Sequence, residues 1–319
     1  MINKQNNIIK VSAPGKIHLL GEHSVVYGKP ALLTTIDSRL YVEVSQSENL
    51  IIHCGNDEKL IKKAIKIVEK ELKLKCPLKV KITIKSDIPY GRHVGSSAAV
   101  SVAVVSALIY YKSGVWDLNL FNRLAYEVEK TQHGNPSGGD NSTVCFGGLI
   151  WFQKISENEK IIKTMPFTIS KNIAGNFILI DTGKPKESTG EMVSYVKSLS
   201  KRNPRVVNDF LNNQEKLVKR LLPVISNSKE EELIDIIKKG EKNLESIGVV
   251  SDHVKSVIRE IEKAGGAGKI CGGGGRKKGT GIILTYHKDK KIIEKIASLF
   301  NLKYNSVKLG VKGLSLENK

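Results

Sequence analysis

One stretch of the sequence constrains the fold more than any other, residues 89–103, which read PYGRHVGSSAAVSVA. A turn-forming Pro-Tyr-Gly leads into Gly95-Ser96-Ser97, and an apolar segment rich in Ala and Val follows. This order predicts a tight loop that opens directly into a buried helix over 95–112. Backbone N–H groups and the positive dipole end at such a helix start favour an anion, although a capping Ser explains the same residues.

The rest of the chain divides into two halves with different patterns. Strand-like segments of the first half lie at 8–13, 31–36, 40–44, 78–85 and 149–153, and helix-like segments at 59–72, 95–112 and 117–130. The second half has strand-like segments at 177–181, on both sides of the glycine-rich 271–281 and at 304–310, and helix-like segments near 189–200, 206–225, 230–246, 252–264 and 292–300. Because strands and helices do not alternate regularly, we predict an α+β fold of two domains, 1–165 and 166–319.

Length and composition describe an ordinary globular protein. The chain has 319 residues, of which 40% are hydrophobic and 26% charged. No apolar run reaches the roughly 18 residues that span a bilayer, and MINKQNNIIK lacks the apolar core of a signal peptide, so we expect a cytoplasmic protein without a membrane partner. The four cysteines form no CxxC pair, which argues against a zinc site or a disulfide framework.

The formal net charge of +19 is compatible with a nucleic acid, an anionic membrane or a small anionic substrate. Lys and Arg are spread along the chain and interleaved with Glu, and aromatic residues make up only 6%. This pattern favours a solvated Lys-rich surface over a nucleic-acid-binding face. A basic nucleic-acid-binding protein stays the alternative from a different functional class, and the same charge would also attract a polyanion such as ATP.

Several polar residues lie in or beside glycine-bearing stretches. Lys16 follows Ala-Pro-Gly, Glu22 and His23 end the run Leu-Leu-Gly, and Glu129 and Asp140 flank a Pro/Gly-rich turn. A carboxylate beside a nucleotide can hold a metal ion or accept a proton from a hydroxyl nucleophile. Each residue also has an ordinary explanation, such as an Asx turn for Asp140. Neither a Walker A loop nor a Rossmann fingerprint is present.

Taken together, four stretches resemble the GHMP kinases: APGKIHLLGEHSVVYGKPA, PYGRHVGSSAA, HGNPSGGDNS and KICGGGG, which extend over about residues 10–286. The first and third are most similar to those of the mevalonate kinase branch. The resemblance implies an N-terminal ribosomal protein S5 domain 2-like domain and a C-terminal ferredoxin-like domain. It also implies transfer of phosphate from ATP, with Mg²⁺, to the C5 hydroxyl of mevalonate in isoprenoid biosynthesis. Dimers are common in the family, so a homodimer is an expectation.

The resemblance also implies roles for individual residues. Lys16 and Asp140 match catalytic positions, and Glu22, His23 and Thr189 match positions near the substrate. Ser97 and Glu129 match the Mg²⁺ ligands. The residues that match the ATP-binding positions are Gly91, Arg92, His93, Val94, Gly95, Ser96, Ser97, Gly272 and Gly273.

The chain departs from the family pattern at two places. His93 replaces a glycine, so it either abandons a positive φ or tolerates the cost, and Arg92 beside it is expected to add a cationic contact to the nucleotide. Residues 276–278, Arg-Lys-Lys, form a basic insertion that we expect to point into solvent. A phosphomevalonate kinase, supported by Lys184 and Lys186, a sugar kinase, and a sensor that has lost activity stay open as alternatives.

Overall fold

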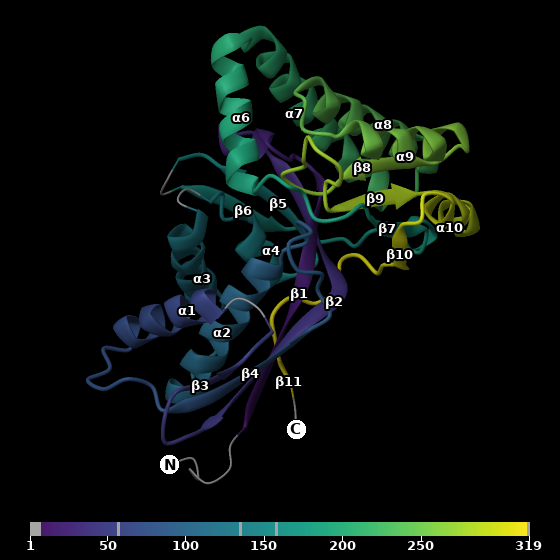
Figure 1. The fold of residues 1–319 in the computed structure, drawn as a ribbon. Coiled ribbons are helices and arrows are strands. Elements are labelled where there is room, and N and C mark those ends of the chain that lie inside the picture. The colour runs from purple at the N-terminus through teal and green to yellow at the C-terminus, as the bar shows by residue number, and fades with distance from the viewer. Residues whose placement is uncertain (1–7, 56–57, 134–135, 157–158, 318–319) are drawn as a thin grey trace.

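The computed structural model describes residues 8–55, 58–133, 136–156 and 159–317, which build two β-sheets with helices packed on them (Figure 1). The first sheet has the order β11-β1-β2-β4-β3, with β5 paired to β2 and β6 to β5. Its strands are β1 (Ile9–Leu20), β2 (Ala31–Gln46), β3 (Ile51–His53), β4 (Val80–Ser86), β5 (Leu149–Lys154), β6 (Lys160–Thr164) and β11 (Ser315–Glu317). All of its pairings are antiparallel except that of β3 with β4.

The second sheet is antiparallel and has the order β10-β7-β9-β8. Its strands are β7 (Phe177–Asp181), β8 (Ala267–Ile270), β9 (Ile282–Tyr286) and β10 (Lys303–Ser306). The helices are α1 (Glu58–Glu71), α2 (Ser96–Ser113), α3 (Leu118–His133), α4 (Gly139–Phe146), α5 (Lys171–Ala174), α6 (Thr189–Arg202), α7 (Pro204–Ser226), α8 (Glu230–Ser246), α9 (Asp252–Lys263), α10 (Lys290–Leu299) and the short 3-10 helix η1 (Ser24–Tyr27). This mixture of helices and mainly antiparallel sheets agrees with the predicted α+β class.

Strands β1 and β2 are longer than the sequence pattern indicated and extend from the first sheet toward the second (Figure 1). The sequence predicted a strand only over 8–13, but β1 continues through Pro14 and Gly15 to Leu20. A register shift between Pro14 and Gly15 accommodates the proline within the ladder, as bulges commonly do. The last ten residues of β1 are all buried, so the extension places Lys16 and the residues that follow it to Leu20 in the interior.

Helix α2 is the centre of the N-terminal half. It packs on β1 and β2 and is covered by α1 and α3, so its residues from Ala98 to Ile109 are all buried. By length and composition this helix is apolar enough to cross a membrane, but 67% of it lies inside the protein. It is therefore the core helix that the Ala- and Val-rich sequence predicted.

Strand β7 shows why the apolar run FILID stands at the start of the second half. Phe177 and Leu179 join the core that the first sheet shares with α7 and α8, whereas Ile178 and Ile180 join a second core under α6, α9 and α10. Successive side chains of a strand point to opposite faces, so a strand buried on both faces needs an unbroken apolar run. The second sheet thus lies between two apolar layers.

The chain returns to the first sheet at its C-terminal end. The sequence indicated a last strand at 304–310, but β10 ends at Ser306, and β11 pairs antiparallel with β1 through Lys10–Glu317 and Val11–Leu316. Residues 307–317 therefore lie against the N-terminal sheet. The division into domains 1–165 and 166–319 stays a prediction.

Candidate active site

Lys16 and His18 are brought to one site by the two-residue period of strand β1. Side chains at positions i and i+2 of a strand lie on the same face. Both residues are buried, and the backbone N–H of Lys16 donates a hydrogen bond to the carbonyl of Val94 at 3.0 Å. Strand β1 therefore holds the loop before α2 directly.

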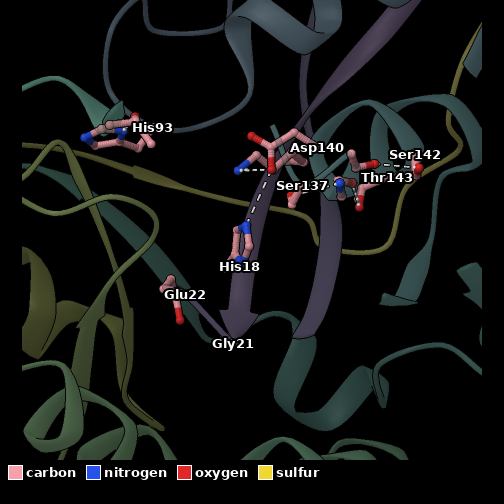
Figure 2. Close-up of polar contacts among 12 residues, drawn as sticks. His18, Gly21, Glu22, His93, Ser137, Asp140, Ser142 and Thr143 are labelled. Carbon is pink, nitrogen blue, oxygen red and sulfur yellow. Dashed lines mark hydrogen bonds and ion pairs between the residues drawn. The ribbon is translucent and has the colours of Figure 1, made fainter. Parts of the chain in front are cut away.

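Asp140 lies in the first turn of α4 and points toward these two residues (Figure 2). Its Oδ1 is 2.9 Å from Lys16 Nζ and 3.4 Å from His18 Nε2. The helix begins at Gly139, and Gly138, with φ 91°, takes the N-cap position, so Asp140 is not the capping residue. The Asx-turn explanation for Asp140 therefore does not describe this structure, and the predicted pair of Lys16 and Asp140 is formed.

The two ends of the Lys16–Asp140 pair differ in exposure. The Lys16 side chain is 3% exposed and the Asp140 side chain 42%. Burial by itself would raise the pKa of Asp140, but the charge of Lys16 and the hydrogen bond from His18 outweigh it and hold the pKa well below its usual range. Burial, with the charge of Lys16, lowers the pKa of His18. At neutral pH the site therefore contains an ionised carboxylate and a neutral imidazole.

The loop before α2, residues 91–95, is the expected phosphate loop, and it leads into an uncapped helix start. Gly95 is the N-cap residue with φ 81°, and no side chain donates or accepts a capping hydrogen bond there. A Cβ at this position would lie 2.7 Å from Lys16 Cγ, so only glycine lets Lys16 pass. The alternative of a simple Ser cap is therefore not what the structure shows. The first N–H groups of α2 point out beside Lys16 and suit an anion.

His93 keeps the backbone conformation of the glycine that it replaces. Its φ is 65°, so the residue tolerates the left-handed region. It packs on the glycine motif of residues 272–275: a Cβ on Gly272 would lie 2.6 Å from His93 Cβ, and one on Gly273 would lie 3.4 Å from Cε1. Nδ1 of His93 is 3.3 Å from the Thr189 hydroxyl. Burial lowers the pKa of His93 to about 4, and the ring is neutral.

The residues next to His93 and the basic insertion make other contacts. The Arg92 guanidinium forms an ion pair with Asp181, with Nε 2.8 Å from Oδ1. The predicted contact of Arg92 with a nucleotide stays a prediction. Residues 276–278 are exposed, as expected, but the Arg276 guanidinium lies over the Tyr195 ring, 4.2 Å from its centroid.

Ser97 and Glu129, the predicted metal ligands, are brought together across α2 and α3. Ser97 Oγ donates a hydrogen bond of 2.6 Å to Glu129 Oε1, and Ser101 Oγ donates another of 2.8 Å to the same oxygen. Glu129 is buried. Part of the third motif, Gly134 and Asn135, lies outside the described residues.

Of the three predicted substrate residues, two lie beside the glycine motif of residues 272–275. His23 Nε2 is 3.1 Å from the carbonyl of Gly273, and Thr189 begins α6 beside His93. Burial lowers the pKa of His23. Glu22 instead pairs with Lys269 of β8, and both side chains are fully buried. Glu22 is thus paired with a cation of the second sheet, and its substrate-binding role stays a prediction.

Three residues of this region were absent from the sequence-based expectations: His18, Ser101 and Lys269. His18 had a signal, because it lies two residues after Lys16 in a strand and must share its face. Ser101 also had one, since it lies one helical turn after Ser97. Lys269 had none, because its partner Glu22 is 247 positions away in the chain.

Comparison with known proteins places this site in a family. Residues 59–148 match the GHMP kinases N terminal domain. A mevalonate kinase of Archaeoglobus fulgidus is 35% identical over 269 residues, which cover 83% of this chain and 88% of the relative. The chain therefore belongs to the GHMP kinase family, and this relative lies in its mevalonate kinase branch.

Solved structures of the family share the fold. The L. major mevalonate kinase in complex with R-mevalonate superposes with a TM-score of 0.78 at 20% identity and covers 93% of both chains. The Streptococcus pneumoniae phosphomevalonate kinase, in complex with phosphomevalonate and AMPPNP, superposes with a TM-score of 0.78 at 19% identity and covers 94% of this chain and 99% of its own. These likenesses confirm the predicted two-domain GHMP kinase fold.

Proposed function

We propose that this protein transfers the γ-phosphoryl group of ATP to the C5 hydroxyl of mevalonate. The observation that carries the proposal is the Lys16–Asp140 contact of 2.9 Å beside the uncapped start of α2. The kinship with mevalonate kinases supports the choice of substrate. A cytoplasmic location and a homodimeric state stay predictions from the sequence.

The site residues divide the work of the transfer between them. The N–H groups at the start of α2 would hold the phosphates, and Lys16 would stabilise charge on the transferring group. Asp140 would orient the hydroxyl and take its proton as the new O–P bond forms and the bond to ADP breaks. Because Asp140 is partly exposed, that proton can then pass to solvent. Most of the acceleration comes from positioning and electrostatics.

Mg²⁺ fits the donors that the structure provides. The Ser97 hydroxyl and the Glu129 carboxylate are hard oxygen ligands 2.6 Å apart at the phosphate loop. Among the described residues, no three His, Cys, Asp or Glu side chains form a metal cluster. This donor set suits an ion that keeps water and takes further ligands from phosphates. When bound, the ion would neutralise charge on the β- and γ-phosphates.

A coupled ADP-release assay tests the proposal with Mg-ATP and four acceptors: mevalonate, phosphomevalonate, galactose and homoserine. We expect turnover on mevalonate alone. Turnover on another acceptor in its place would contradict the substrate and keep the kinase chemistry. If none of the four acceptors led to ADP release, the result would contradict both the proposed substrate and the proposed kinase chemistry.

Phosphomevalonate is the second candidate acceptor because of Lys184. Its stem lies over the phosphate loop, where a Cβ on Gly91 would be 3.1 Å from Lys184 Cε, and its ammonium lies 5.6 Å from the Tyr90 ring centroid. A cation there serves either ATP or an acceptor phosphate. A Lys184→Met variant separates the two: a higher KM for ATP with mevalonate as acceptor assigns the lysine to the nucleotide.

Glu129→Gln tests the metal assignment. The amide keeps an oxygen that accepts from Ser97 and Ser101 but loses the charge that attracts Mg²⁺. We expect the apparent Mg²⁺ affinity, measured by titration at saturating ATP, to fall by about tenfold or more. Glu127→Gln, a half-exposed carboxylate on the same helix, is the matched control. An unchanged Mg²⁺ titration in Glu129→Gln would contradict the ligand role.

A further inference from the structure

His18 contacts the reactive carboxylate although no chemistry assigned so far uses it. Its Nε2 lies 3.4 Å from Asp140 Oδ1, the same oxygen that Lys16 approaches at 2.9 Å (Figure 2). We infer that His18 is a positioning residue, which locks the Asp140 carboxylate through Oδ1 so that Oδ2 receives the substrate hydroxyl. The inference rests on the proposed phosphoryl transfer.

The geometry of the backbone aims this imidazole. The β1–β2 register shifts between His18 and Leu20, and such bulges redirect side chains. The carbonyl of His18 accepts a hydrogen bond of 3.3 Å from the buried Lys269 ammonium. The residue is thus fixed at its backbone by the second sheet and at its ring by Asp140. A ring held from both sides can fix its partner in turn.

The hydrogen-bond partners of the two ring nitrogens define the tautomer of His18. A carboxylate only accepts hydrogen bonds, so Nε2 of a neutral His18 must carry the proton. Nδ1 is then an acceptor, and it is buried without a partner among the residues that the structure describes. An unpaired buried acceptor is unfavourable by about 1–3 kcal/mol. An apolar side chain would fill the same space without that cost, so the contact of Nε2 with Asp140 is the feature that distinguishes histidine here.

The charged residues around His18 have opposite effects on the pKa of its imidazole. Lys16 lowers the pKa of His18, whereas Asp140 and Glu22 raise it, and burial decides the outcome in favour of the neutral ring. Burial also lowers the pKa of two other imidazoles among the described side chains, His23 and His93. Among the described residues, Lys16 is the cation that pairs with the carboxylate, and the neutral His18 adds a donor without adding a second charge. The carboxylate keeps its charge and gains a fixed orientation.

Three substitutions at one position test this assignment. The amide nitrogen of His18→Gln reaches the place of Nε2, whereas that of His18→Asn reaches only the place of Nδ1, and His18→Leu has no donor. We expect His18→Leu and His18→Asn to lower kcat on mevalonate by about 10- to 100-fold, since misplacement of a reacting group by about 1 Å has effects of that size. His18→Gln should retain most of the wild-type kcat. The KM for ATP should stay within about threefold of wild type in all three.

The pH profile provides a readout that a merely structural role would not move. Loss of the His18 donor removes one of the contributions that hold the pKa of Asp140 low. The acid limb of the pH profile, where kcat falls as Asp140 is protonated, should therefore shift to higher pH in the Leu and Asn variants and not in the Gln variant. Equal kcat and equal acid limbs in the Gln and Asn variants would overturn the inference. So would wild-type values in His18→Leu.

An activity-independent measurement separates this inference from the proposed function. ¹⁵N NMR of the imidazole nitrogens should show a neutral Nε2–H tautomer that disappears in His18→Leu and loses its tautomeric preference in Asp140→Ala. That result would support the contact even if mevalonate were not turned over. An Nδ1–H tautomer in the wild-type protein would overturn the assignment whatever the substrate.

Discussion

Strand β1 and the residues just after it make two ion pairs that differ in what surrounds them. Lys16 pairs with Asp140, whose side chain is 42% exposed, and Glu22 pairs with Lys269, where both side chains are 0% exposed. The first pair joins β1 to α4 within the N-terminal half, and the second joins it to β8 of the other sheet. Only the first leaves a carboxylate within reach of a solute.

We infer from this difference that burial, not charge, distinguishes the proposed catalytic pair from a structural pair. Removing one partner of a fully buried pair leaves an uncompensated charge and destabilises a protein by about 3–5 kcal/mol. A partly exposed carboxylate instead keeps access to water and to a substrate proton. Changes at Asp140 should therefore act on turnover, and changes at Glu22 or Lys269 on the free energy of unfolding.

Asp140→Asn should have the largest effect on activity. We expect kcat on mevalonate to fall by about 10²- to 10⁴-fold, the usual contribution of a positioned base. The asparagine oxygen still accepts a hydrogen bond from Lys16, so the free energy of unfolding in urea should change by less than about 2 kcal/mol. A kcat within tenfold of wild type would contradict the role of Asp140.

Lys269→Met should have the largest effect on stability. The variant leaves Glu22 buried without its partner and removes the donor to the carbonyls of His18 and Ile270. We expect the free energy of unfolding to fall by about 3–5 kcal/mol, whereas kcat per folded molecule should fall less than in His18→Leu, because the His18 ring keeps its contact with Asp140. Urea unfolding and the ADP-release assay at a permissive temperature measure the two quantities.

Two controls decide whether this second pair is purely structural. The double variant Glu22→Leu, Lys269→Met removes both charges and should regain most of the lost stability. Glu22→Gln should lower the free energy of unfolding and leave kcat/KM for mevalonate close to that of wild type. If Glu22→Gln instead raised KM for mevalonate without loss of stability, the contrast would fail, and the substrate role predicted from sequence for Glu22 would stand.

Much of this arrangement was predictable where the signal is local. Periodicity placed α8 at 230–246, where the structure has it. The pairs Lys16–Asp140 and Ser97–Glu129 were implied by the resemblance to the GHMP kinases, because each residue read alone has an ordinary explanation.

The failures lie where distant segments decide the structure. Helix α4 begins in GGDNST, which is typical of a turn, but the Ser142 and Thr143 hydroxyls bond to the carbonyls of Gly138 and Gly139 and are buried there. Strand β11 has only three residues and forms because β1 supplies its partner. No local propensity reports a pairing across almost the whole chain.

Glu241 adds a third case to the two ion pairs: a buried carboxyl group that forms no ion pair among the described residues. One of its oxygens accepts a hydrogen bond of 3.0 Å from the N–H of Ile270, the other has no partner among the described residues, and burial raises the pKa to about 8. The folded state therefore holds a proton that the unfolded chain releases above about pH 4.3. Stability should thus fall as pH rises from that value through about 8.

Glu241→Gln should remove this pH dependence. The amide oxygen still accepts from Ile270, and nothing titrates, so the variant should exceed wild type at pH 8 by about 1–3 kcal/mol in the free energy of unfolding. The difference should narrow as the pH approaches 5. Urea titrations at several pH values measure it, and a constant difference across that range would show that Glu241 is ionised in the folded protein.

His93→Gly should have the smallest effect, and it tests how the phosphate loop meets the glycine motif of residues 272–275. Glycine relieves the φ of 65° but loses the contact with Gly272 and the 3.3 Å contact with Thr189. Lys73→Gly, at an exposed turn with φ 49°, reports the backbone gain alone. We expect Lys73→Gly to gain about 0.5–1 kcal/mol and His93→Gly to gain less, because the lost ring contacts offset the relief. The KM for ATP should rise only in His93→Gly. If the two variants gained equal stability and the KM for ATP stayed unchanged in His93→Gly, the imidazole would contribute neither to stability nor to ATP binding. A glycine would then serve equally well at position 93.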